Sequence, residues 1–262
     1  MYRTIALRLI IIAFVLLSIS TSSLSVPIQR LDPVIADSLA QMTDDPLVRA
    51  DYYSRAWLNE KALSALEASG HEDAEVLWRL ARSRIDMGEN LEGDAALALY
   101  DKAMDEAQRA VDLDSKNALA QQTLAVACGR VALFKGVFKS LGLVKRVHEA
   151  ALRAAAESDS VPIALYVLGK THKKLIEKPA LIRKPLGLGW ANEDSVAYYF
   201  KRALEVSQNN MIQCFVEYAE FLVEEGDKQN AKIMFESAIA LPLRDEQDGK
   251  AKDRAREMLK TL

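Results

Sequence analysis

Apolar residues recur at intervals of three and four along almost the whole chain after Leu31. This spacing places them on one face of an α-helix, so the pattern predicts a succession of amphipathic helices. Runs that alternate apolar and polar residues, which mark strands, are missing, and so is the Asn-Gly pair typical of hairpin turns. The prolines fall between the helical runs. The fold class is therefore predicted to be all-α.

The predicted helices come in pairs, and a charged helix over residues 247–262 follows the last pair as a cap. Two stretches between helices are long, one at 134–143 and one, rich in proline and glycine, at 177–192. The five predicted pairs are 46–57 with 60–68, 72–87 with 94–113, 118–133 with 144–157, 162–176 with 194–206, and 211–225 with 228–240. Within them, Asn59 is expected to cap its helix and Gly88 to end its helix as a C-terminal cap.

The spacing of large and small residues inside these pairs is typical of a tetratricopeptide repeat. It is clearest in the last pair, and the Leu168-Gly169 step of the fourth pair has a glycine where two helices must approach closely. The residues of the last pair that carry the pattern are Phe215, Tyr218, Ala219, Leu222, Ala231, Phe235, Ala238 and Pro242. Because no pair can bury its apolar face alone, stacked pairs are expected to form a curved solenoid with a concave groove.

The N-terminus has the pattern of a secretory signal peptide. Arg3 and Arg8 precede an apolar run at 10–17, and small residues follow up to Ser25. We therefore expect a signal peptide at 1–25, an N-terminal segment at 26–44 and a repeat domain at 45–262, in an exported protein that is periplasmic or secreted. The alternative is an uncleaved N-terminal anchor, although the run is shorter than the roughly 20 residues of a comfortable membrane span.

The charges are distributed unevenly along the chain. Residues 115–190 contain 13 Lys or Arg and four acidic residues, whereas the whole chain has a formal net charge of −3. This basic region favours an anionic partner, or it is a solvated surface. The two cysteines, Cys128 and Cys214, lie on apolar helical segments, where they are either small buried thiols or, in an exported protein, a disulfide pair.

Several stretches resemble the regulator of microtubule dynamics family. The resemblance is carried by residues 50–52, by 73–82 around Trp78 and Arg82, by the Leu168-Gly169 helix with the insertion after it, and by 195–203, and it covers roughly 48–240. It implies an all-helical adaptor, whose animal members are associated with microtubules and mitochondria. The export signal departs from those members, and an exported protein does not meet microtubules. The family pattern marks no catalytic residues.

Catalytic and cofactor motifs are absent from the sequence. His71, His148 and His172 lack metal-ligand spacing, and Gly187-Leu-Gly189 does not follow a strand, as a phosphate-binding loop would. No nucleophile elbow is present. The sequence thus predicts a protein that is not an enzyme and that has no cofactor, metal site or nucleic-acid partner.

The concave groove is the better candidate for a functional site. With Gly169 as the reference position, the first helix of each pair is expected to direct a set of side chains into the groove: Trp78, Arg82, Gln122, Arg130, Tyr166, Lys170, Lys173, Lys174 and Glu220. Five of these nine are Lys or Arg, which suits an acidic peptide or a carboxylate terminus. The predicted partner-binding residues are all of these except Gln122 and Glu220.

The insertion is a second candidate surface. Residues 178–190 combine Arg183 and Lys184 with Leu181, Ile182, Leu186, Leu188 and Trp190. Such a loop suits contact with a membrane surface or closure of the groove, or it packs on its own repeat.

Two functions remain open from the sequence. The first is a non-catalytic exported adaptor that binds a protein or peptide in a basic concave groove. The second is a binding component for a small anionic ligand in a periplasmic uptake system. An open groove would favour the first and an enclosed pocket the second.

Overall fold

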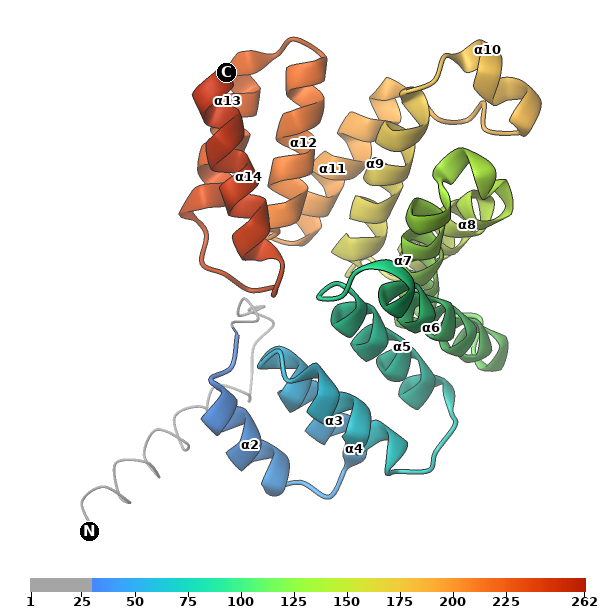
Figure 1. Cartoon of the computed structure of the whole chain (residues 1–262), viewed down its shortest axis with the longest axis vertical. Coiled ribbons are helices and arrows are strands. Elements are labelled where there is room, and N and C mark those ends of the chain that lie inside the picture. The colour runs from blue at the N-terminus through green and yellow to red at the C-terminus, as the bar shows by residue number, and fades with distance from the viewer. Residues whose placement is uncertain (1–29) are drawn as a thin grey trace.

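The computed structural model describes residues 30–262, and these residues fold as thirteen α-helices and two short 3₁₀ helices (Figure 1). The all-α prediction is confirmed for this part of the chain. The predicted signal peptide at 1–25 lies outside the described residues. The helices before the insertion are α2 (Pro33–Gln41), α3 (Pro46–Arg55), α4 (Asn59–Glu67), α5 (Ala74–Gly88), α6 (Gly93–Leu113), α7 (Ala118–Lys135), η1 (Val137–Lys139), α8 (Leu141–Glu157) and α9 (Pro162–Ile176). Those from the insertion onward are α10 (Ala180–Arg183), η2 (Lys184–Leu186), α11 (Glu193–Val206), α12 (Ile212–Glu224), α13 (Lys228–Ala240) and α14 (Asp248–Thr261).

The helix starts follow local sequence signals. Asp45 accepts hydrogen bonds from the first backbone N–H groups of α3, and Asp73 and Asn117 do the same for α5 and α7. The predicted cap at Asn59 is wrong by one position, because Leu58 is the N-cap of α4 and makes no side-chain bond there. The tight turn explains the shift: Trp57 has a φ of 63°, and the chain enters the helix one residue early.

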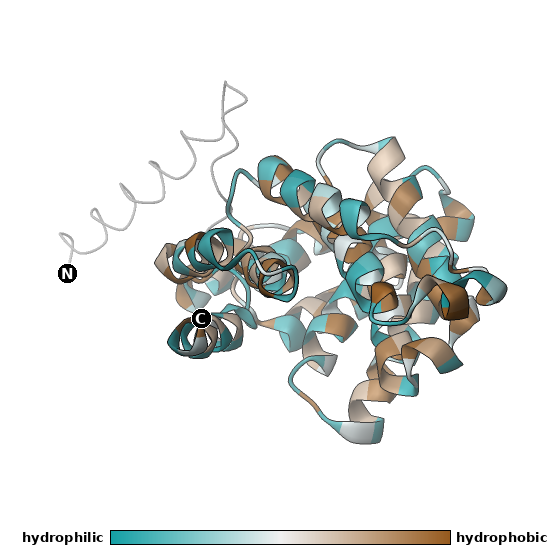
Figure 2. Ribbon diagram, turned by 90° about the horizontal axis from the view of Figure 1, so that it is seen from above, coloured by the Kyte–Doolittle hydropathy of each residue, from teal (hydrophilic) through white to brown (hydrophobic). Residues whose placement is uncertain are grey.

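Five helix pairs stack in sequence as predicted: α3 with α4, α5 with α6, α7 with α8, α9 with α11, and α12 with α13. The first helices of neighbouring pairs also contact one another, which curves the stack into the superhelix of Figure 1. Brown apolar positions lie between the helices in Figure 2, with teal polar positions on the outside. The last helix, α14, packs on α12 and α13 and buries Ala251 and Ala255, as the predicted cap should.

Two glycines set how closely paired helices approach. A Cβ on Gly169 would lie 2.8 Å from the ring of Phe200 on α11, so this position confirms the close approach that the sequence predicted. Gly88 plays the same role, because a Cβ there would lie 2.6 Å from the ring of Tyr100 on α6. Its predicted role as a cap is wrong: Gly88 is the last helical residue of α5, and the C-cap is Glu89.

The two long connections pack together. The turn between α7 and α8, with η1, and the insertion that holds α10 and η2 share a small core of apolar side chains. Its buried members are Ala132, Val144, Leu175, Leu188 and Ala191. In Figure 1 both connections occupy the same corner of the molecule. The insertion is thus held at the far end of α7 and α8 rather than across the groove.

The superhelix closes on itself through the segment between α13 and α14. The indole N–H of Trp57 donates to the carbonyl of Arg244 (3.3 Å), and the Asn59 amide donates to Glu246 (3.3 Å). The Gln247 amide donates to Asn90 (3.0 Å). These polar contacts join the last elements to the first pairs.

Both cysteines are free thiols with no exposed surface, so the buried-thiol interpretation is confirmed over the disulfide. Burial raises the pKa of Cys128 to about 11, against a smaller opposing effect of Arg146. Among residues 30–262, every helix is too short or too polar to cross a membrane.

The Gly169 contact predicts a measurable loss of stability. Gly169→Ala should lower the free energy of unfolding by about 1–3 kcal/mol, because its methyl group would overlap the ring of Phe200. Gly142→Ala on α8 is the matched control: nothing lies within 4 Å of a Cβ there, so it should leave stability unchanged or raise it by up to about 1 kcal/mol. Urea unfolding measures the free energy of unfolding of both variants. An equal change in the two variants would contradict the close packing of Gly169 on Phe200.

Candidate functional site

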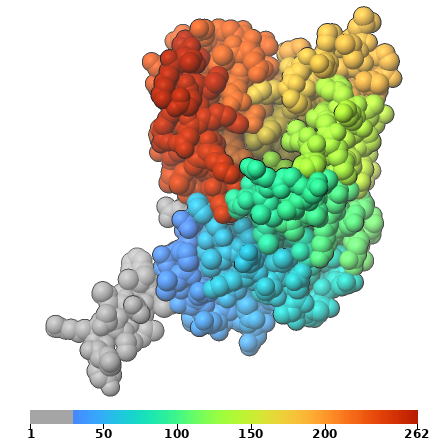
Figure 3. Space-filling view, viewed as in Figure 1, coloured from blue at the N-terminus to red at the C-terminus, as the bar shows by residue number. Residues whose placement is uncertain are grey.

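The concave side is lined by the first helices of the pairs, and their polar side chains meet across the helix boundaries. Figure 1 shows α5, α9, α12 and α14 around the centre of the superhelix, and Figure 3 shows a hollow there between α14 (red), α9 (yellow) and the green elements. We call this surface the concave face. It is defined by Asp51, Arg82, Asp86, Glu89, Gln122, Arg130, Tyr166, Lys170, Lys173, Glu217, Glu220 and Arg254.

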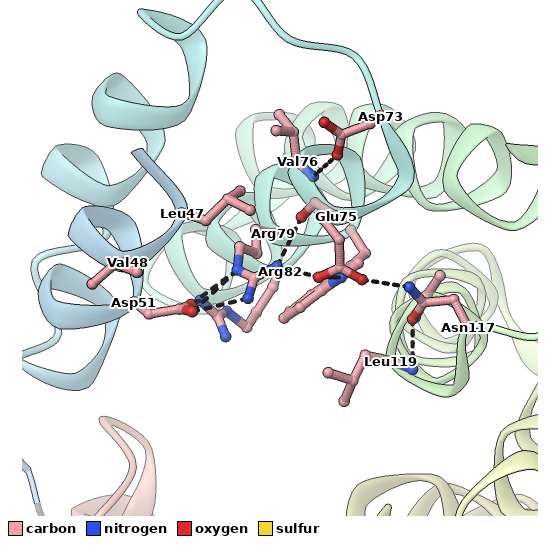
Figure 4. Close-up of polar contacts among 12 residues, drawn as sticks. Leu47, Val48, Asp51, Asp73, Glu75, Val76, Arg79, Arg82, Asn117 and Leu119 are labelled. Carbon is pink, nitrogen blue, oxygen red and sulfur yellow. Dashed lines mark hydrogen bonds and ion pairs between the residues drawn. The ribbon is translucent and has the colours of Figure 1, made fainter. Parts of the chain in front are cut away.

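At one end of the concave face, Asp51 of α3 binds two arginines of α5. Its carboxylate accepts from Arg79 Nη2 at 3.0 Å and from Arg82 Nη2 at 2.9 Å (Figure 4). On the other side of α5, Glu75 accepts from Arg79 (2.6 Å) and from the amide of Asn117, the N-cap of α7 (2.6 Å). Three successive first helices are therefore joined by charge-assisted hydrogen bonds.

Further along, Glu89 at the end of α5 forms an ion pair with Arg130 of α7. At the other end, Glu217 of α12 lies 3.0 Å from Lys170 Nζ and 3.3 Å from Lys173 Nζ, both of α9. Glu220 pairs with Lys173 (3.1 Å) and with Arg254 of α14 (2.7 Å). Each basic side chain is thus bound by a carboxylate of a neighbouring element.

These pairs shift the pKa values of the carboxyl groups. Burial acts to raise the pKa of Glu217, but Lys170, Lys173 and Arg254 outweigh it and lower the pKa to about 2. Glu217 is therefore ionised at any physiological pH. Burial raises the pKa of Glu89, and the attraction of Arg130 offsets only part of that rise.

Four polar groups of the concave face lack a hydrogen-bond partner within residues 30–262. Arg82 Nε, Arg130 Nε and Gln122 Oε1 are buried and make no hydrogen bond, and Asp86 makes neither a hydrogen bond nor an ion pair. They come from two adjacent helices, α5 and α7. Buried polar groups are normally satisfied by protein or by ordered water, so a set of unsatisfied groups in one place distinguishes this part of the concave face.

Asp86 is the most perturbed of these groups. Burial raises its pKa to about 8; Arg82 opposes that rise, and the nearby carboxylates Glu89, Asp245 and Glu246 add to it. The carboxylates come from the end of α5 and from the segment that closes the superhelix. Asp86 therefore carries a proton through most of the neutral range.

The structure brings most of the predicted binding residues together. Arg82, Arg130, Tyr166, Lys170 and Lys173 belong to the concave face, where the Tyr166 ring is buried with Lys170 Nζ 5.5 Å from its centroid. Partner binding by these residues stays a prediction.

Two predicted residues stand apart. Trp78 is only 4% exposed; it belongs to the core, and the guanidinium groups of Arg79 and Arg82 cover its ring at 4.2 and 5.1 Å. Lys174 pairs with Glu177 at the end of its own helix.

The net charge of the face differs from the expectation. Arg82, Arg130, Lys170 and Lys173 are all ion-paired, so the concave face is charge-balanced rather than basic. The repeat register located the cations but not the carboxylates that bind them. The partners of Lys173 lie 44 and 47 residues away along the chain, and no short-range pattern links them.

Sequence reasoning missed Asp51, Asp86, Glu89, Glu217 and Arg254. Glu217 had a usable signal, because it lies one helical turn before Glu220, which was placed on the face. Asp86 likewise lies one turn after Arg82. Arg254 had no such signal in the sequence, because its position depends on the tertiary packing of α14 against α12.

Two of the histidines meet at the insertion rather than on the concave face. His148 stacks on Trp190 with ring centroids 3.7 Å apart, and the ring of His172 lies edge-on to the same indole at 5.0 Å. Burial, with help from His148, lowers the pKa of His172 to about 4, and the backbone N–H of Asn192 donates to its Nδ1. No cluster of three or more potential metal ligands occurs among residues 30–262.

Five stacked helix pairs with a polar concave face define a helical-repeat protein of the tetratricopeptide type. A solved structure with the same architecture is a thermophilic tetratricopeptide repeat protein of Thermus thermophilus, with a TM-score of 0.60 at 17% identity over 84% of this chain and 98% of that one. This likeness concerns the fold.

Residues 47–262 match the profile of the family described as regulator of microtubule dynamics protein 1-3, and the chain belongs to this family. Mouse regulator of microtubule dynamics protein 1 is 23% identical over 84% of this chain and 74% of its own length. The bovine regulator of microtubule dynamics protein 3 is 28% identical over 64% of this chain and 37% of its own length. The family match extends past residue 240 through α14, which the sequence resemblance did not include.

The raised pKa of Asp86 predicts a pH-dependent stability. Between about pH 4 and pH 8 the folded chain binds a proton at Asp86 that the unfolded chain releases, so the free energy of unfolding should fall as pH rises through this range. Asp86→Asn should remove this part of the slope and stabilise the protein at pH 8 by roughly 2 kcal/mol. Thermal unfolding between pH 5 and 8 measures the effect. Asp105→Asn, at an exposed position on α6, is the control, and an equal response in both variants would contradict the assignment.

Proposed function

We propose that this chain is a non-catalytic scaffold that binds an extended segment of a partner protein along its concave face. The observation that carries the proposal is the set of unsatisfied groups on α5 and α7: Arg82 Nε, Arg130 Nε, Gln122 Oε1 and Asp86. Two guanidinium groups, an amide oxygen and a protonated carboxyl offer both donors and acceptors, as the binding of a peptide backbone requires, and the guanidinium groups also suit a carboxylate.

The ion pairs within the concave face determine how acidic a partner segment it can bind. The lysines of α9 are already bound to Glu217 and Glu220, so they are not free to hold a strongly acidic peptide. The guanidinium groups of Arg82 and Arg130 are each bound to a carboxylate through Nη2 only, and both side chains are 32% exposed. A segment with one well-placed carboxylate, from an acidic side chain or a chain terminus, fits better than a run of acidic residues.

The alternative function, binding of a small anionic ligand, has weaker support. That function needs an enclosed pocket, and the insertion was the segment expected to close it. The insertion packs instead against α7 and α8, where Trp190 stacks on His148 and Leu188 is fully buried. Export of the chain, predicted from residues 1–25, remains part of this proposal and would place the partner outside the cytoplasm.

Site-specific photocrosslinking tests the proposal. A photoreactive amino acid replaces Gln122 on the concave face or, as the control, Tyr198, which is 61% exposed on α11. We expect irradiation of the native cells to yield protein adducts from position 122 only. Arg130→Met should reduce the yield roughly tenfold, because one charge-assisted hydrogen bond is worth about 1.5–3 kcal/mol.

Equal adduct yields from both positions would contradict a concave-face site. Adducts absent from position 122, together with a small molecule retained by the purified protein in native mass spectrometry, would favour the small-ligand function. Circular dichroism of each variant checks that helicity is intact.

A further inference from the structure

The corner of the molecule formed by the insertion has a composition unlike the rest of the surface. Two segments meet there, residues 133–148 and residues 178–191, and neither contains a single acidic residue. Their shared core places them side by side, and a Cβ on Gly187 would lie 3.0 Å from Lys145 Nζ. This corner lies at the upper right of Figure 1 and, as gold and yellow-green spheres, of Figure 3.

The insertion directs apolar side chains both inward and outward. Leu188 and Trp190 pack inward, whereas Leu181 is 85% exposed and Ile182 is 51% exposed at the tip formed by α10. Most of the Leu181 side chain and half of the Ile182 side chain are therefore left uncovered by the described chain. They are available to an apolar phase outside the protein.

The tip is held rigidly in this orientation. Arg183 is buried and donates to the backbone carbonyls of Lys178 (2.8 Å), Leu188 (3.3 Å) and Ala191 (2.6 Å). One guanidinium therefore ties both ends of the loop together. Leu181 and Ile182 are already ordered when they contact another surface, which removes an entropic cost of binding.

Exposed lysines lie on both of the segments that form this corner. Lys139, Lys145, Lys178 and Lys184 are exposed and make no ion pair within the described residues. This contrasts with the lysines of the concave face, which are all neutralised. Four unpaired cations beside two exposed aliphatic side chains attract a negatively charged surface that has an apolar interior.

We infer that this corner, the membrane patch (Lys139, Lys145, Lys178, Leu181, Ile182 and Lys184), docks the protein on an anionic lipid bilayer. Leu181 and Ile182 enter the boundary between headgroups and acyl chains, and the lysines contact lipid phosphates. A protein partner fits less well, because a stable protein interface needs about 800 Å² on each side, and two side chains on a convex tip supply far less. A bilayer requires no shape complementarity. Docking here leaves the concave face free for its partner.

An environment-sensitive fluorophore at the tip tests this inference in the full chain. The two native cysteines are fully buried, so a Leu181→Cys variant offers one exposed thiol for labelling. The control is Ile233→Cys, at an exposed position on α13. The probes are vesicles of phosphatidylcholine alone and vesicles of phosphatidylcholine mixed with phosphatidylglycerol.

We expect a blue shift and an intensity gain at position 181 with the anionic vesicles, no change at position 233, and reversal by added salt. Because each result is local to the label, attachment of the chain to vesicles through another segment does not produce it. The absence of a shift at position 181, or equal shifts at both positions, would overturn the inference. The first of these results would favour a protein partner at this corner instead of a bilayer.

A charge-matched pair of triple variants completes the test. The first triple variant, made in the Leu181→Cys background, carries Lys145→Gln, Lys178→Gln and Lys184→Gln. It should bind the anionic vesicles at least roughly tenfold more weakly, because each lysine near an anionic surface contributes about a fivefold factor to the affinity. The control triple, Lys116→Gln with Lys201→Gln and Lys250→Gln, removes the same charge from exposed lysines elsewhere and should leave the shift at position 181 intact. An equal loss in both triples would contradict a defined membrane patch.

Discussion

Carboxylates that bind cations across helix boundaries are the interaction on which the concave side of this protein depends. Asp51, Glu89 and Glu217 each hold a basic side chain of the next or previous first helix. The helix pairs themselves are held by apolar packing, with glycine where a ring must approach. The apolar core stacks the pairs, whereas the ion pairs add directional contacts that link one first helix to its neighbour.

This arrangement has a consequence for recognition. A groove of free lysines would attract any anion, and its binding would fall steeply with salt. A face whose charges are paired lacks this general attraction and keeps only a few unpaired groups in reserve. The unsatisfied groups of α5 and α7 are such a reserve. Four exposed lysines without an ion pair among residues 30–262 lie instead at the insertion and the neighbouring turn, where the inferred membrane patch would bind an anionic surface.

The fold could be predicted well from the sequence because local signals determine it. Helix starts follow Asp and Asn caps, and the apolar spacing reports which face each helix buries. The candidate site could be predicted only in part. The register of α9 predicted that Lys170 and Lys173 share one helix face, but the carboxylates that neutralise them come from α12, more than forty residues away. The closure of the superhelix through Arg244, Glu246 and Gln247 likewise depends on tertiary contacts, which no local sequence pattern predicts.

A double-mutant cycle at Lys173 and Glu217 measures whether cross-helix ion pairs stabilise the concave face, because both side chains are largely buried and lie on helices of different pairs. The free energies of unfolding are measured for Lys173→Met, Glu217→Gln and the double variant. If cross-helix ion pairs organise the concave face, the double variant should lose at least about 1 kcal/mol less than the sum of the single losses. Losses that add within about 0.3 kcal/mol would show that the pair is not coupled and would contradict the account.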